Sequence, residues 1–217
     1  SAPVRRGAFT FLSRRHAKKE KSIVTWKEGK GGEEKVLFDP NTWSKDGSAS
    51  LGDWQPSWDG TRVAYQVKAN NSDEATLRVV EVATGKVSDV DVIEGGKYAS
   101  ASWMPDGSGF YYTWLPTDPK IPVDERPGYQ EVRFHRLGED PKQDHVVYGR
   151  LGDPTAFVAS SVSRDGRWLV LSVQHGWTST DVSFRDLADP AQADRWTPLV
   201  VGTEAHWSVE VFRDRFY

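Results

Sequence analysis

Few residues in this chain stand at the spacings that enzymes use for chemistry. A hydrolase that attacks through serine commonly carries that serine in a Gly-x-Ser-x-Gly turn, and neither Gly47-Ser48-Ala49-Ser50 nor Gly107-Ser108-Gly109 fits this pattern. The five histidines include no pair at the helical i, i+4 spacing, and the sequence has no cysteine, so the usual zinc-binding patterns are missing. We therefore predict no catalytic residue, no metal site and no cofactor within this chain.

Two pairs of adjacent acidic residues, Glu33-Glu34 and Asp124-Glu125, are further candidates for acid–base chemistry. A glycosidase needs two carboxyl groups that flank the scissile bond, whereas adjacent acids are explained better by solvated turns. The pairs Gly85-Lys86 and Gly96-Lys97 lack the remainder of a phosphate-binding loop. None of these residues is therefore expected to carry out a reaction.

Tryptophan is the unusual feature of the composition, with ten copies in 217 residues. Trp177 follows Gln174-His175-Gly176 and lies at the end of an apolar run, in a loop. Because loops carry binding residues more often than strands do, Trp177 is the better candidate for contact with a ligand. Other tryptophans lie in or beside predicted strands and are expected to pack between sheets; these are Trp54, Trp58, Trp103 and Trp168.

The elements that must position these residues are organised around a repeated turn. Asp59-Gly60, Asp106-Gly107 and Asp165-Gly166 are each followed by a short apolar or aromatic run. Asp-Gly supplies the positive φ of a tight hairpin turn, and the run suits a half-buried strand. The copies are about 47 and 59 residues apart, which fits one four-stranded propeller blade with loop insertions. On spacing alone, three unrelated hairpins of a β-sandwich remain an alternative.

The succession of turns and apolar runs predicts an all-β fold, a partial β-propeller of about four and a half blades of four-stranded antiparallel sheet. We expect the blades to cover residues 8–52, 53–96, 97–150 and 155–202, with a fifth beginning at 204–217. The stretch Leu115–Tyr129 contains four prolines, so we expect a long loop without regular structure there, and loops of this length are often functional.

Charge and hydropathy argue against two classes of partner. The net charge is −3, with basic and acidic residues interspersed, which removes the electrostatic reason to expect a nucleic acid. The sequence contains no apolar run of about 18 residues, so no membrane span is predicted. The lack of cysteine fits a reducing compartment, and we expect the cytoplasm, with the periplasm as the alternative. The first and last residues suggest a piece of a longer protein.

Several longer motifs resemble the prolyl oligopeptidase (prolyl endopeptidase) family, especially its bacterial members. Residues 39–51, DPNTWSKDGSASL, are similar to the family stretch D-P-N-x-x-S-x-D-G-T-x-x-L. Residues 92–112, VIEGGKYASASWMPDGSGFYY, resemble the same enzymes, as do WLPTDP at 114–119 and VDERPGY at 123–129. The resemblance runs from about residue 5 to the last residue, and its motifs keep their order.

The resemblance implies a serine peptidase that cleaves short peptides after proline. Such an enzyme has an α/β-hydrolase domain with a Ser-Asp-His triad, and a propeller of about seven blades that caps the active site. This chain would hold the first four and part of the fifth blade, without the triad, so it should cleave no peptide alone. Its implied partners are the hydrolase domain of the same protein and short proline-containing peptides.

The resemblance also carries over the roles of individual residues. The family positions that help to line the outer substrate pocket correspond to Tyr98, Phe157 and Trp177, which are large and apolar, as a pocket for a peptide side chain needs. Asp73 matches an acid that contacts the hydrolase domain. Gln174 stands where mammalian members carry arginine, which argues against an ionic role there. Two alternatives stay open: aromatics that merely pack sheet edges, and a stand-alone propeller scaffold that binds a protein or a glycan.

Overall fold

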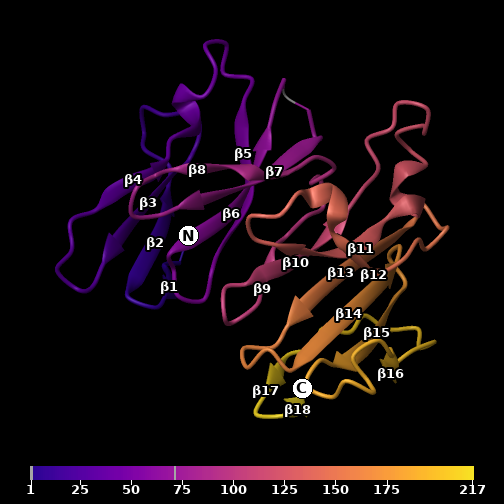
Figure 1. Cartoon of the computed structure of the whole chain (residues 1–217). Helices are drawn as coiled ribbons and strands as arrows, with labels where there is room; N and C mark the ends of the chain where they lie inside the picture. The colour runs from indigo at the N-terminus through magenta and orange to yellow at the C-terminus, as the bar shows by residue number, and fades with distance from the viewer. Residues whose placement is uncertain (1, 71) are drawn as a thin grey trace. The chain divides into compact units, whose positions relative to one another are not determined.

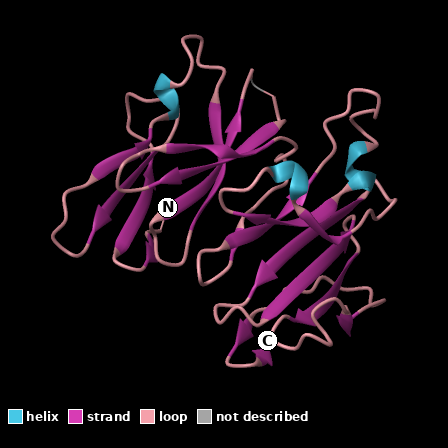
Figure 2. Ribbon diagram, viewed as in Figure 1, coloured by secondary structure: helices cyan, strands magenta, loops and turns pink. Residues whose placement is uncertain are grey.

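The computed structural model describes residues 2–70 and 72–217, and the chain divides into two compact units. The first unit holds the residues up to Ser100 together with Gly138–Pro141, and the second holds Ala101–Leu137 and Lys142–Tyr217. Within the described residues there are four antiparallel sheets of four strands and one two-stranded hairpin (Figures 1 and 2). The all-β prediction, with blades of four antiparallel strands, is therefore confirmed.

The first unit consists of two sheets in which neighbouring strands in sequence are neighbours in space. The strands of the first sheet are β1 (Val4–Arg6), β2 (Phe9–Arg14), β3 (Ile23–Glu28) and β4 (Lys35–Phe38). A 3-10 turn, η1 (Pro40–Thr42), leads to the second sheet, with strands β5 (Ser50–Pro56), β6 (Arg62–Lys68), β7 (Ala75–Glu81) and β8 (Val87–Ile93). The first sheet begins at Val4, ahead of the expected boundary at residue 8, because Val4 to Arg6 pair with Phe11 to Phe9.

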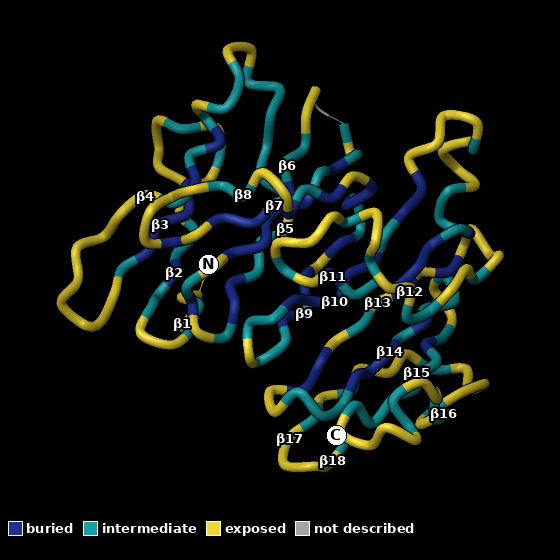
Figure 3. Tube along the Cα trace, viewed as in Figure 1, coloured by how far each residue is buried: buried dark blue, intermediate teal, exposed yellow. Residues whose placement is uncertain are grey.

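The core of the first unit lies between its two sheets. Phe11 and Trp54 approach with ring centroids 6.2 Å apart, and Phe38 and Tyr65 with centroids 4.4 Å apart. Each pair joins a strand, or the end of a strand, of the first sheet to a strand of the second, so the aromatic residues supply the apolar area that holds the sheets together. The buried members are Phe11, Val24, Trp26, Phe38, Val63, Tyr65, Val80 and Val82 (Figure 3).

The second unit has the same construction, followed by a hairpin. The third sheet of the chain contains β9 (Ser102–Trp103), β10 (Gly109–Trp114), β11 (Glu131–Arg136) and β12 (His145–Tyr148). The fourth sheet of the chain contains β13 (Ala156–Val162), β14 (Trp168–His175), β15 (Ser179–Asp186) and β16 (Thr197–Val200). The hairpin consists of β17 (Val211–Phe212) and β18 (Arg215–Phe216). Apolar side chains of β10, β11, β13 and β14 form the core between these sheets.

The three Asp-Gly turns all join the first strand of a sheet to the second. Gly60, Gly107 and Gly166 have φ of +77°, +71° and +77°, the left-handed region that glycine enters without a Cβ clash. In the last of these turns the carboxylate of Asp165 accepts hydrogen bonds from the Ser163 hydroxyl and from the Arg167 N–H. The sequence prediction of hairpins at these positions is therefore confirmed.

The proline-rich segment between β10 and β11 is mostly irregular, with one exception. Its last residues form a 3-10 turn, η2 (Arg126–Tyr129). The expectation that four prolines exclude all regular structure was wrong here, because Pro127 lies in the first turn of η2, where a missing N–H costs no hydrogen bond. The short η3 (Pro141–Gln143) precedes β12. Among the described residues, no helix is long and apolar enough to cross a membrane.

Candidate functional site

Two of the four candidate residues from the sequence, Phe157 and Trp177, lie near one end of the fourth sheet, the end where β13 begins and β14 finishes. In the fourth sheet, Ala156 at the start of β13 pairs with His175 at the end of β14. Phe157 is therefore the second residue of β13, and Trp177 lies in the turn that leads from β14 to β15. Two residues far apart in sequence thus reach the same end of one sheet.

Phe157 and Trp177 both expose an aromatic ring on an ordered backbone. Phe157 is 42% exposed and Trp177 is 94% exposed, although large aromatic side chains usually gain free energy from burial. The backbone of the Trp177 turn is held by His206, whose Nε2 donates to the Trp177 carbonyl at 2.9 Å. Gln174 donates from Nε2 to the carbonyl of Gly176 at 2.9 Å, a structural contact within the same turn. The turn is thus fixed while its indole faces solvent.

A buried glutamine fixes the backbone around Phe157. Gln130 is 0% exposed and donates from Nε2 to the carbonyls of Ala156 at 2.7 Å and Pro127 at 2.6 Å. Its Oε1 accepts from the N–H of Val158 at 3.1 Å. The amide therefore bonds main-chain groups on both sides of Phe157 that lie on the outer edge of the sheet, where β13 has no neighbouring strand among the described residues and these groups would otherwise be buried without a partner.

Tyr98 lies in a connector that a second buried glutamine holds in a similar way. Gln66, in the middle of β6, is 4% exposed. Its Nε2 donates to the carbonyls of Gly96 at 2.9 Å and of Ala99, so both contacts flank Tyr98. The ring of Tyr98 is half-buried, and the Lys97 ammonium lies 5.6 Å from its centroid. Tyr98 thus has a supported backbone, with a side chain that is only partly accessible.

Asp73 is placed differently from the aromatic candidates. It lies in the loop between β6 and β7, at the surface, and its carboxylate is 3.6 Å from the Lys68 ammonium. An exposed ion pair of this length contributes little to stability. Asp73 is therefore an accessible acid whose partner is a surface lysine, and its position demands no structural role.

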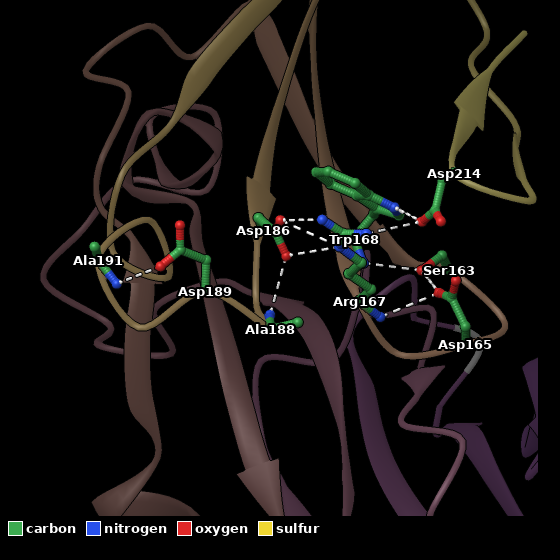
Figure 4. A network of polar contacts seen from close by, with 9 residues as sticks. All are labelled: Ser163, Asp165, Arg167, Trp168, Asp186, Ala188, Asp189, Ala191 and Asp214. Carbon is green, nitrogen blue, oxygen red and sulfur yellow. Dashed lines mark hydrogen bonds and ion pairs between the residues drawn. The ribbon is translucent and has the colours of Figure 1, made fainter.

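A network of charged contacts in the second unit lies at the other end of the fourth sheet (Figure 4). Arg167 donates to both carboxylate oxygens of Asp186, at 2.8 to 3.2 Å, and to Asp214 at 3.2 Å. The indole N–H of Trp168 also donates to Asp214, at 3.0 Å. The hydrogen bond from Arg167 lowers the pKa of Asp186. Because Asp214 belongs to the turn between β17 and β18, this network attaches the terminal hairpin to the fourth sheet.

A buried Tyr–Asp–His arrangement in the third sheet resembles catalytic machinery in composition only. The Tyr112 hydroxyl donates to Asp144 at 2.7 Å, and Nδ1 of His135 lies 2.8 Å from the other oxygen of the same carboxylate. Burial raises the pKa of the Tyr112 hydroxyl, and the His135 side chain has no exposed surface. This network joins strands and reaches no solvent. Over the described residues, no cluster of His, Asp and Glu could hold a metal ion.

The two glutamines are functional candidates that the sequence analysis did not identify. The main-chain groups that they bond beside Tyr98 and Phe157 lie 26 to 33 positions away in the chain, so no local motif indicates these contacts. The one available signal is a glutamine within the apolar run Val63-Ala64-Tyr65-Gln66-Val67. A buried polar side chain in such a run must find partners, and these partners prove to be the connectors that carry Tyr98 and Phe157.

Comparison with known proteins gives a consistent result over the whole chain. The family model described as "Prolyl oligopeptidase, N-terminal beta-propeller domain" matches residues 1–217. The prolyl endopeptidase of Elizabethkingia meningoseptica is 26% identical over 209 residues, which are 96% of this chain and 29% of that protein. The prolyl endopeptidase of Elizabethkingia miricola is 27% identical over 207 residues, 95% of this chain and 28% of that protein. The chain thus spans under a third of these relatives.

Solved structures agree with the sequence comparisons. A structure described as "Structural and Mechanistic Analysis of Two Prolyl Endopeptidases: Role of Inter-Domain Dynamics in Catalysis and Specificity" is 52% identical, with a TM-score of 0.94, and the match covers 100% of this chain and 32% of that one. Prolyl oligopeptidase B from Galerina marginata, bound to a 35mer substrate, is 21% identical with a TM-score of 0.80, over 96% of this chain and 32% of that one. The second likeness shows the fold alone.

Proposed function

Because the chain belongs to the prolyl oligopeptidase N-terminal β-propeller family, we propose that it admits short proline-containing peptides to a serine peptidase and lines the outer part of their binding site. The cleavage itself is assigned to a hydrolase domain of the same protein. A Gly-x-Ser-x-Gly turn is expected in the complete coding sequence. If the complete gene encoded a propeller alone, a scaffold that binds a protein or a glycan would replace this proposal.

The observation that carries the proposal is the pair of exposed aromatic side chains on fixed backbone, Phe157 and Trp177. A binding surface gains affinity when its contact groups are ordered before the ligand arrives, because less conformational entropy is lost on binding. His206 and Gln130 supply that order through hydrogen bonds to the main chain. Tyr98, on the connector held by Gln66 in the first unit, is assigned separately to contact with the peptide, by its resemblance to a family position.

The contact with the hydrolase domain is assigned to Asp73. Its carboxylate is 78% exposed, and its ion pair with Lys68 is long, so it can be re-paired with a basic group at little cost. Asp73→Asn is expected to weaken the attachment of the hydrolase domain by about 0.2–1 kcal/mol in the full-length protein. The measurement is the accessibility of the domain boundary to limited proteolysis, at low and at high salt.

The test of the peptide-binding role uses Phe157→Ala and Trp177→Ala in the full-length enzyme. Each variant should lose about 1–3 kcal/mol of binding free energy for peptides that extend beyond the two residues nearest the scissile bond. Minimal substrates should keep their kcat/KM. Phe212→Ala is the matched control, because Phe212 is also exposed but lies on the terminal hairpin. Equal losses for long and minimal substrates would contradict the proposal and indicate a defect of folding or docking.

A further inference from the structure

A pocket of about 370 Å³ lies in the second unit, next in the chain to the strand that carries Phe157. One wall is the end of the proline-rich segment between β10 and β11, and the other is the connector between β12 and β13. Its lining residues are Glu125, Gly128, Tyr129, Arg150, Gly152 and Pro154.

The walls of the pocket are joined to each other by hydrogen bonds. The N–H of Gly152 donates to the carbonyl of Gly128 at 2.9 Å. Gln130 bonds Pro127 on one wall and Ala156 beyond the other. At Gly128 an added Cβ would lie 3.2 Å from the backbone nitrogen of Pro154, so the close approach of the walls depends on glycine there. The pocket is therefore formed before any ligand binds.

The guanidinium of Arg150 is held at the pocket but remains accessible. Its side chain is 65% exposed, and its Nε lies 3.5 Å from a carboxylate oxygen of Glu131. The other oxygen of Glu131 accepts from Arg133 at 2.9 Å. The Arg150 guanidinium also lies 5.4 Å from the centroid of the Tyr129 ring. The aromatic face and the carboxylate orient the cation, whose planar fork offers five N–H donors.

The pocket thus combines a cation, an anion and apolar walls. Arg150 is a donor, the exposed carboxylate of Glu125 is an acceptor, and Tyr129 and Pro154 give apolar surface. A simple anion would suit Arg150 but would be repelled by Glu125, and a simple cation would meet the reverse problem. A peptide segment matches all three features, because it offers a carbonyl acceptor, an N–H or amine donor and an apolar side chain.

We propose that this pocket is an additional subsite of the peptide-binding surface, which takes an apolar residue of the peptide between Tyr129 and Pro154. In this subsite Arg150 donates to a peptide carbonyl and Glu125 accepts from a peptide N–H. The inference rests on the proposed function, since it places the peptide along the connector that leads to Phe157. Pro154 and Phe157 are three positions apart in the chain, a distance of at most about 10 Å. The residue bound in the pocket is therefore about two to three positions from the residue at Phe157.

The experiment compares Arg150→Gln and Glu125→Gln in the full-length enzyme, with peptides lengthened one residue at a time. Arg195→Gln and Glu204→Gln are the matched controls, because both residues are exposed in the same unit, outside the pocket. Each pocket variant should lower kcat/KM about tenfold once the peptide reaches the pocket, since one hydrogen bond to a charged group is lost. Shorter peptides, and all peptides with the control variants, should be unaffected.

The outcomes separate this inference from the function on which it rests. If Trp177→Ala selectively weakens long peptides while Arg150→Gln has no effect at any length, the pocket is not a subsite and the proposed function stands. If neither variant discriminates by length, the proposed function itself fails. A loss confined to peptides with an acidic residue would overturn the assignment to a peptide segment and indicate an anion site instead.

Discussion

The segments that contain Tyr98 and Phe157 are held by the same kind of hydrogen bonding in two different units. In each, one buried glutamine bonds main-chain groups on both sides of the aromatic residue: Gln66 around Tyr98 and Gln130 around Phe157. A glutamine suits this task because its amide offers two donors and an acceptor without a charge that burial would penalise. The recurrence indicates that the sheets do not position these aromatics by strand pairing alone.

The two segments differ in the other backbone contacts that support them. Phe157 lies within β13, and its strand is paired residue by residue with β14 from Ala156 to Val162. Tyr98 lies outside any strand, where the backbone contacts are Gly96 N–H to Ala75 carbonyl at 2.9 Å and Ala99 N–H to Gly96 carbonyl at 3.0 Å. Gln130 thus adds to the strand pairing that already holds Phe157 in the second unit, whereas Gln66 is a main support of the Tyr98 segment in the first.

The largest loss of stability is expected for Gln130→Leu. This change leaves the carbonyls of Pro127 and Ala156 and the N–H of Val158 without the partner they have now, in a fully buried position. Each unsatisfied buried group costs about 1–3 kcal/mol, so we expect a total of about 3–5 kcal/mol after partial relaxation. The measurement is the free energy of unfolding in urea. Gln143→Leu is the control, since Gln143 is exposed in the same unit, and a loss below about 1 kcal/mol would show that water replaces the amide.

Gln66→Leu is expected to cost somewhat less in global stability but to loosen its connector more. The carbonyls of Gly96 and Ala99 lose their shared donor, and no strand ladder holds that segment in place. We expect a loss of about 2–4 kcal/mol and a marked rise in amide hydrogen exchange over residues 96–101. In Gln130→Leu only the Val158 N–H of β13 loses its partner, and the amides that bond β14 should stay protected. Equal exchange at both segments would remove the difference between them.

A third variant displaces the Gln66 side chain without replacing that residue. A Cβ at Gly52 would lie 2.3 Å from Oε1 of Gln66, and that oxygen now accepts from the Asp53 N–H at 3.1 Å. Gly52→Ala should therefore displace the glutamine and cost about 1–3 kcal/mol. Gly149→Ala is the control, because an added Cβ there meets nothing within 4 Å. If Gly52→Ala left both stability and exchange at the connector unchanged, Gln66 would not be the main support.

The sequence predicted the parts of this molecule that local chemistry decides. Asp165-Gly166 and the two similar turns follow from the positive φ of glycine and the Asx hydrogen bonds that precede it, and the alternating runs predicted four-stranded sheets. The roles of Phe157 and Trp177 came from family motifs and stay predictions. The roles of Gln66 and Gln130 could not be predicted from the sequence, because their partners come near them only when separate parts of the chain pack together. The same holds for the pocket at Arg150, whose walls come from separate segments.

The smallest effect concerns pH. It distinguishes the hydrogen bonds of Gln66 and Gln130, here called the glutamine clamps, from the Asp-Gly turns at the opposite ends of the sheets. The hydrogen bond from the Ser163 hydroxyl, aided by the Arg167 N–H, lowers the pKa of Asp165 below its ordinary value near 3.8. A lowered pKa in the folded state means that this stabilisation is complete above about pH 4 and is lost as the pH falls through the folded value. Asp165→Asn should therefore flatten part of the acid loss of stability. The glutamine amides do not titrate, so the cost of Gln130→Leu should be the same at pH 7 and at pH 3, as measured by urea unfolding. A cost that shrank in acid would show that the clamp at Phe157 depends on a charged neighbour, and the two clamps would then differ in kind.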